Sequence, residues 1–184
     1  ALSQADYTAV NGSVTILANQ LTASIDVSGI VDDSLLEGDE TVVVTLSGID
    51  SGSSDITLDP TPANLTDTVT IADNDVATVS ISANDADASE TATDNGQFTV
   101  TLTKASDTDT VINYNIGGSA SGTADYTALT GSVTILANQL TATIDVSGIV
   151  DDSLLEGDET VVVSLSGIDS GSSDIKLDPT PANL

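Results

Sequence analysis

Apolar and polar residues alternate through four runs between residues 78 and 146. The apolar members are Val79, Ile81 and Ala83; Phe98, Val100 and Leu102; Ile112, Tyr114 and Ile116; and Leu140, Ala142, Ile144 and Val146. Many of these residues are β-branched, and no segment has a helical period. A period of two is typical of half-buried antiparallel strands. The pattern therefore predicts an all-β protein.

Short turn sequences separate these runs. Asp94-Asn95-Gly96 and Gly117-Gly118 both stand between apolar runs, and residues 67–72 form a further expected strand. Short strands between closely spaced turns favour a β-sandwich. Because Phe98 and Tyr114 alternate with polar residues, we expect them to fill its core, together with Tyr7 and Tyr126.

One internal repeat organises the chain. Residues 5–65 match residues 124–184 at an offset of 119, and only five of 61 positions differ: Val10/Leu129, Asn11/Thr130, Ser24/Thr143, Thr45/Ser164 and Thr57/Lys176. A period of this length is too long for a solenoid unit and suits one sandwich domain. The near-identity indicates either a recent duplication or selection for a uniform building block.

We place the boundary between the two repeats after residue 75. Residues 1–75 are then the C-terminal part of one repeat and lack the strands equivalent to 77–116, while residues 76–184 lack the strand equivalent to 67–72. The connection over residues 73–76 has no flexible spacer, so consecutive repeats should not swing freely. Because half a sandwich exposes its core, we expect strands from another chain, or from outside this sequence, to complete the first repeat.

The charge of the chain excludes several functions. It has 29 acidic residues against Lys104 and Lys176, which gives a net charge of -27. Such a surface repels nucleic acids and anionic membranes, and no stretch is long enough to span a bilayer. Adaptation to high salt is an alternative explanation, but it predicts acids on outward strand faces, which here hold mostly Thr and Ser. The acids cluster in loops instead.

Three motifs resemble the Calx-beta domain. They are "EGDETVVVTL" at 37–46, "VTIADND" at 69–75 and "GTADYTALTGSVTI" at 122–135. This domain is a Ca²⁺-binding sandwich found in sodium/calcium exchangers and repeated in large bacterial surface adhesins. The resemblance implies immunoglobulin-like Greek-key β-sandwich modules in tandem, with Ca²⁺ held by carboxylates in loops at one end.

The resemblance also implies which residues bind the metal. In the first copy they are Asp6, Asp32, Asp33, Glu37, Glu40, Asp73, Asn74 and Asp75. In the second copy they are Glu90, Asp125, Asp151, Asp152, Glu156 and Glu159. Asn74 stands where the family has an acid, as do Ser34 and Ser153, which implies fewer or weaker ions per site.

The chemistry of the residues independently favours calcium. Ca²⁺ takes about six to eight oxygen ligands in irregular geometry, which loops rich in Asp, Glu and Asn can supply. Mg²⁺ needs stricter octahedral order, and zinc, copper and iron lack their usual ligands because the chain has no His, Cys or Met. No EF-hand loop is present, so any site must be assembled from separate loops.

These observations predict a structural protein rather than an enzyme. Paired carboxylates can hydrolyse glycosides, but the chain has only Phe98, Tyr7, Tyr114 and Tyr126 as sugar platforms and no histidine base. The first hypothesis is a Ca²⁺-rigidified stalk module of a secreted bacterial cell-surface adhesin, in contact with neighbouring repeats of its own polypeptide. The alternatives are a domain that grips a carbohydrate or protein partner and a regulatory calcium sensor.

Overall fold

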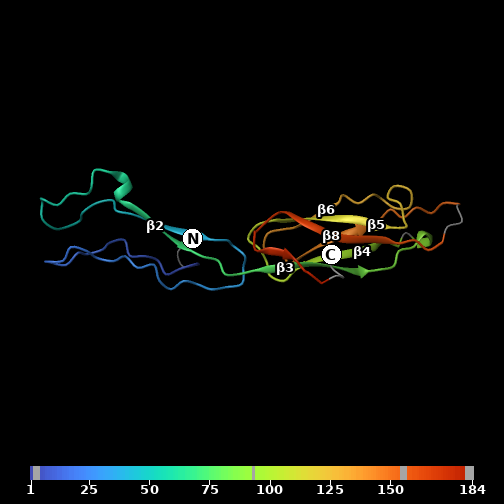
Figure 1. Ribbon diagram of the computed structural model, residues 1–184, viewed down its shortest axis with the longest axis horizontal. Coiled ribbons are helices and arrows are strands. Elements are labelled where there is room, and N and C mark those ends of the chain that lie inside the picture. Colours follow the sequence, from blue (N-terminus) through green and yellow to red (C-terminus); the bar gives the residue numbers. More distant parts are fainter. Residues whose placement is uncertain (2–4, 93, 154–156, 181–184) are drawn as a thin grey trace. The chain divides into compact units, whose positions relative to one another are not determined.

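The computed structural model describes residue 1 and residues 5–92, 94–153 and 157–180. It consists of two compact units (Figure 1), of which the first comprises Ala1–Asp33 and Asp39–Asp73 and the second comprises Ser34–Gly38 and Asn74–Leu184. Apart from two short 3₁₀ turns, the regular elements of the described residues are all strands. The predicted all-β class is therefore confirmed.

The second unit is a sandwich of two sheets. The first sheet has the order β7-β4-β3-β9 and the second has the order β6-β5-β8. The strands of the first sheet are β3 (Ala77–Asp85), β4 (Gly96–Leu102), β7 (Thr141–Val146) and β9 (Ile175–Leu177). Those of the second sheet are β5 (Thr110–Gly118), β6 (Ser132–Ile135) and β8 (Val161–Ser170). Neighbouring strands are antiparallel, except that β9 runs parallel to β3.

The inward residues of both sheets form one core in the second unit. Its buried members include Val79, Ile81, Val100, Leu102, Ile112, Tyr114, Ile135, Ile144, Val163, Leu165 and Ile175, with Phe98 packed against them. Tyr126 is also buried, as expected. The four alternating runs of the sequence correspond to β3, β4, β5 and β7, so their prediction as strands is confirmed.

The first unit contains little regular structure. Its two-stranded sheet pairs β1 (Glu40–Thr45) with β2 (Thr66–Ile71), which is the strand expected at 67–72. The 3₁₀ turn η1 (Pro62–Asn64) precedes β2, as η2 (Glu90–Ala92) precedes β4 in the second unit. Among the described residues, no helix has the length and apolar composition that crossing a membrane requires.

A short piece of the acidic loop at residues 29–41 is part of the second unit. Leu36, within Ser34–Gly38, is fully buried in the core of that unit. Its N–H donates to the carbonyl of Ala105 at 3.0 Å, and its carbonyl accepts from the N–H of Asp107 at 3.0 Å. These two bonds form a parallel bridge between Leu36 and Ser106. A loop residue with no strand pattern around it thus becomes a core residue.

Truncation of this side chain should destabilise the second unit. Leu36→Ala leaves a cavity in the core, and such changes cost about 2–5 kcal/mol. Hydrogen exchange of the β3 and β4 amides should therefore accelerate. The control is Leu21→Ala, because Leu21 is 94% exposed and its truncation should alter stability by less than about 0.5 kcal/mol. Equal exchange rates in both variants would show that Leu36 does not support this core.

Candidate metal centre

Two carboxylates meet in the first unit. Carboxylate oxygens of Asp6 and Glu40 lie within 4.8 Å of each other, and both residues are half-buried. Glu40 is the first residue of β1, and Asp6 precedes an isolated bridge between Thr8 and Ser28. At this separation, two negative charges repel by about 3 to 4 kcal/mol at an effective dielectric near 20. The arrangement therefore favours a bound cation.

Backbone bonds fix the loop that presents Asp6. The N–H of Val31 donates to the Asp6 carbonyl at 2.9 Å, and the N–H of Thr8 donates to the carbonyl of Ser28 at 2.9 Å. Gly29, which follows Ser28, has φ +62 and lies directly against the Thr8 side chain. A larger residue at this position would strain the backbone and clash with Thr8. The loop thus holds the Asp6 carboxylate in a defined place.

The acidic stretch at residues 29–41 also contains Asp32, Asp33 and Glu37. Asp32 and Asp33 are exposed, and neither joins Asp6 and Glu40 within 4.8 Å. Glu37 belongs to the segment that forms part of the second unit, where it is exposed. Within the first unit, the structure therefore brings together Asp6 and Glu40.

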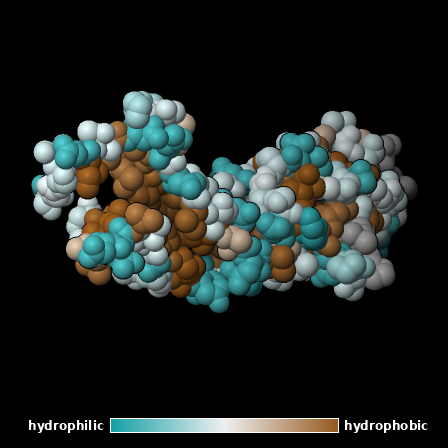
Figure 2. Space-filling view, turned by 60° about the vertical axis from the view of Figure 1, so that its left-hand side comes forward, coloured by the Kyte–Doolittle hydropathy of each residue, from teal (hydrophilic) through white to brown (hydrophobic). Residues whose placement is uncertain are grey.

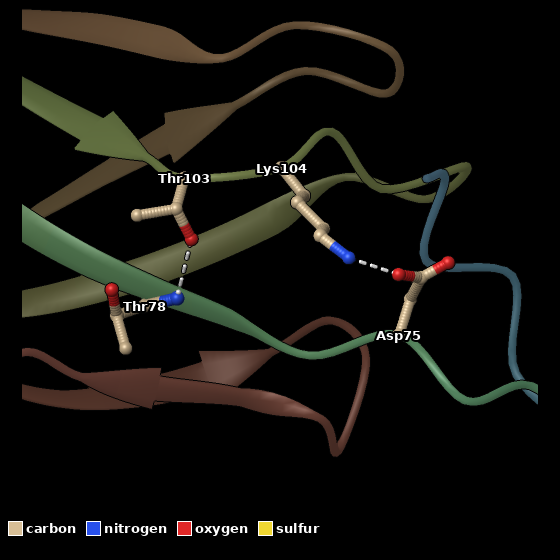
Figure 3. A network of polar contacts seen from close by, with 4 residues as sticks. All are labelled: Asp75, Thr78, Thr103 and Lys104. Atoms are coloured by element: carbon tan, nitrogen blue, oxygen red, sulfur yellow. Dashed lines mark hydrogen bonds and ion pairs between the residues drawn. The ribbon is translucent and has the colours of Figure 1, made fainter. Parts of the chain in front are cut away.

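The triplet Asp73-Asn74-Asp75 is divided between the units. Asp73 closes the first unit, where its N–H donates to Oδ1 of Asp39 at 3.2 Å. Asn74 is exposed, whereas Asp75 is 7% exposed and lies at the start of the second unit. The side chain of Asp75 forms an ion pair with Lys104, which follows β4 (Figure 3). One proposed ligand is therefore already paired with one of the two lysines in the chain.

The register of the sheet explains this ion pair. Val79 pairs with Leu102, and the N–H of Thr78 donates to Oγ1 of Thr103 at 2.9 Å (Figure 3). Continuation of the same antiparallel register places residue 104 opposite Ala77, the first residue of β3 and two residues after Asp75. Sequence reasoning missed Lys104, although the register of the two alternating runs and the scarcity of lysine could have identified it.

The second copy reproduces the loop around Asp125. The N–H of Val150 donates to the Asp125 carbonyl at 2.9 Å, as Val31 does to Asp6. The carboxylate of Asp125 accepts from the N–H of Ser121 at 2.5 Å. Gly148 has φ +64 and lies against Thr127, as Gly29 lies against Thr8. Identical sequence therefore produces the same loop in both copies.

The remaining acids of the second copy do not converge. Glu90, Asp151, Asp152 and Glu159 are exposed, and Glu156 lies outside the described residues. Among the acids that the structure describes in this copy, no three have carboxylate oxygens within 4.8 Å of one another. A complete set of ligands for this copy therefore remains a prediction.

Local hydrogen bonds lower the pKa of two other acids, Asp59 and Asp178. The side-chain amide of Asn64, with the N–H of Thr61, lowers the pKa of Asp59. The side chain and the N–H of Thr180 likewise lower the pKa of Asp178, which is the copy of Asp59. Both carboxylates stabilise turns by accepting these bonds. Their role is structural, and they lie outside the proposed metal-binding set.

Comparison with known proteins identifies the family of these repeats. The model of the Calx-beta domain matches the chain twice, over residues 1–75 and 72–184. No curated protein and no solved structure gave a significant match. The resemblance seen in the three sequence motifs is therefore confirmed, and the two matches support tandem repeats.

Loss of the buried ion pair should weaken the second unit. Lys104→Met leaves the Asp75 carboxylate buried without its cation, which should lower the free energy of unfolding by about 1–3 kcal/mol. Lys176→Met is the matched control because Lys176 is exposed, and its effect should stay below about 0.5 kcal/mol. Urea unfolding in the presence of a chelator measures both variants without a competing metal ion. An equal loss of stability in the two variants would contradict a structural role for the pair.

Proposed function

The chain belongs to the Calx-beta domain family, and on this basis we propose that it is a calcium-stabilised spacer in the stalk of a large secreted bacterial adhesin. Calx-beta domains are associated with calcium binding and are a non-catalytic family. They occur in extracellular or membrane-associated proteins. Millimolar extracellular calcium would keep such sites occupied at the cell surface.

The approach of Asp6 to Glu40 is the observation that supports calcium binding most directly. Two half-buried carboxylates within 4.8 Å supply hard oxygen ligands from two separate segments. In the proposal, the other residues suggested for the first repeat contribute further oxygens or neutralising charge: Asp32, Asp33, Glu37, Asp73 and Asn74. Asp125, Glu90, Asp151, Asp152, Glu156 and Glu159 have the same role in the second repeat.

The spacer role follows from the repeat and its short connection. We take residues 1–75 as the end of one repeat and 76–184 as most of the next, joined through Asp73, Asn74, Asp75 and Val76. Cations bound among the acids at this connection would restrict the angle between consecutive repeats. Neighbouring repeats of the same polypeptide are then the principal protein partners, and uniform sequence suits a uniform rod.

Removal of calcium should make the chain more flexible. In small-angle scattering at constant ionic strength, addition of a chelator should broaden the distribution of interatomic distances. Addition of excess calcium should restore the original distribution, and magnesium should restore less of it, because Mg²⁺ fits irregular loops poorly. A distribution that is identical with and without chelator would rule out the spacer mechanism and favour a domain that grips a partner.

Removal of individual ligands should weaken calcium binding. Asp6→Asn and Glu40→Gln each remove one anionic ligand, and each should lower the affinity of the first repeat at least about tenfold. Asp26→Asn is the control, because Asp26 is exposed and lies outside the proposed set. Isothermal titration with calcium measures all three variants. Wild-type affinity in Asp6→Asn and Glu40→Gln would remove this pair from the site.

A further inference from the structure

The first unit exposes an unusually apolar face. Its exposed large apolar residues are Val14, Ile16, Leu17, Leu21, Ile25, Ile30, Val31, Val43, Leu46, Ile49, Ile56 and Val69. Figure 2 shows apolar side chains gathered around a hollow in the part of the molecule that the first unit forms. A contiguous exposed patch of this kind marks an interaction site in a soluble protein.

The second unit buries the copies of several of these residues. Ile16 is 56% exposed and its copy Ile135 is 1% exposed, and Leu46 and Leu165 are 42% and 3% exposed. Ile56 and Ile175 show the same contrast, at 60% and 3%. None of the five positions that differ between the copies is buried in the second unit. The environment therefore differs between the two copies, while the buried sequence does not.

Strands β3, β4 and β5 account for this difference. In the second unit, β6 and β8 both pair with β5, and β7 pairs with β4. Residues 13–16 and 22–27 of the first unit have the sequence of β6 and most of β7, yet they form no strand. Strand formation depends on cross-strand neighbours rather than on intrinsic preference alone. The first unit thus lacks the partner strands that its sequence requires.

We propose that the apolar face of the first unit is the docking site for a second copy of the strand segment 77–118. This copy would be joined ahead of residue 5 as residues 77–123 are joined ahead of Ala124. Its alternating Val, Ile and Thr residues would pair with residues 13–16, 22–27 and 42–51 in the registers seen in the second unit. The proposal does not depend on calcium binding.

A whole second chain cannot be the occupant, because each chain has fewer copies of segment 77–118 than it has halves that need one. Each chain supplies one segment 77–118 for two nearly identical receiving halves, residues 5–65 and 124–184. In the second unit this segment is already paired with β6, β7 and β8. Exchange of strands between two chains keeps the same proportion. Two of the four receiving halves in a dimer would remain open, so a further copy of the segment alone is needed.

An extended chain tests the proposal directly. Residues 76–123 are duplicated and placed ahead of residue 5, in place of residues 1–4, and hydrogen exchange is measured in the presence of a chelator. The amides of residues 14–16, 23–27 and 42–46 should slow by at least roughly a hundredfold toward the rates of their copies in β6, β7 and β8. Unchanged exchange at these amides would overturn the proposal.

Two further measurements separate docking from a general change in stability. In the extended chain, Ile16→Asp should abolish the new protection of the first unit and leave the second unit unchanged, whereas Ile135→Asp should do the reverse.

A peptide of residues 76–123 added to the original chain should bind once and protect residues 14–16. Protection of the first unit in the extended Ile16→Asp variant would overturn the docking proposal. So would dimers of the original chain that persist in chelator and protect residues 14–16 without added peptide. Because every arm contains chelator, failure here is distinguishable from failure of the calcium proposal.

Discussion

Repulsion among carboxylates is the constraint on which the rest of the structure depends. With 29 acidic residues and two lysines, the chain cannot balance its charge by internal ion pairs. One of the two lysines, Lys104, pairs with Asp75, the one carboxylate that is buried among the described residues. Burial of an unpaired carboxylate would be costly. Lys104 therefore pairs with the carboxylate whose burial would otherwise cost the most free energy. Most of the remaining acids lie in loops, where water and external cations can reach them.

The comparison of the two copies separates the effect of sequence from the effect of environment. The loops around Asp6 and Asp125 form in both copies, because their hydrogen bonds join residues of the same repeat. The segments 13–16 and 132–135 differ, because only the second copy has β5 beside it. Local loops therefore need only their own sequence, whereas strands need partners. This distinction explains how identical residues form part of a core in one unit and an exposed face in the other.

The sequence was sufficient to predict the strands and the family. Alternation identified β3, β4, β5 and β7, and the motif at 69–75 identified β2 with the terminal acids. Leu36 could not be predicted as a core residue, because it lies in an acidic loop without periodicity and is buried by contacts distant in sequence. The pairing of β9 with β3 is parallel, and such long-range pairing has no local sequence signal. Carboxylates could be proposed as ligands by type and family, but their convergence depends on loop positions that the sequence does not fix.

Calorimetric melting of the protein in calcium and in sodium chloride, at matched ionic strength, tests most directly whether bound cations offset the repulsion between carboxylates. If specific cations offset the repulsion between carboxylates, millimolar calcium should raise the melting temperature well above the value in sodium chloride, because a ligand that binds only the folded state stabilises it. Chelator should return the melting temperature to the value measured in sodium chloride. The same melting temperature in all three solutions would contradict the account, since it would mean that screening alone keeps this acidic chain folded.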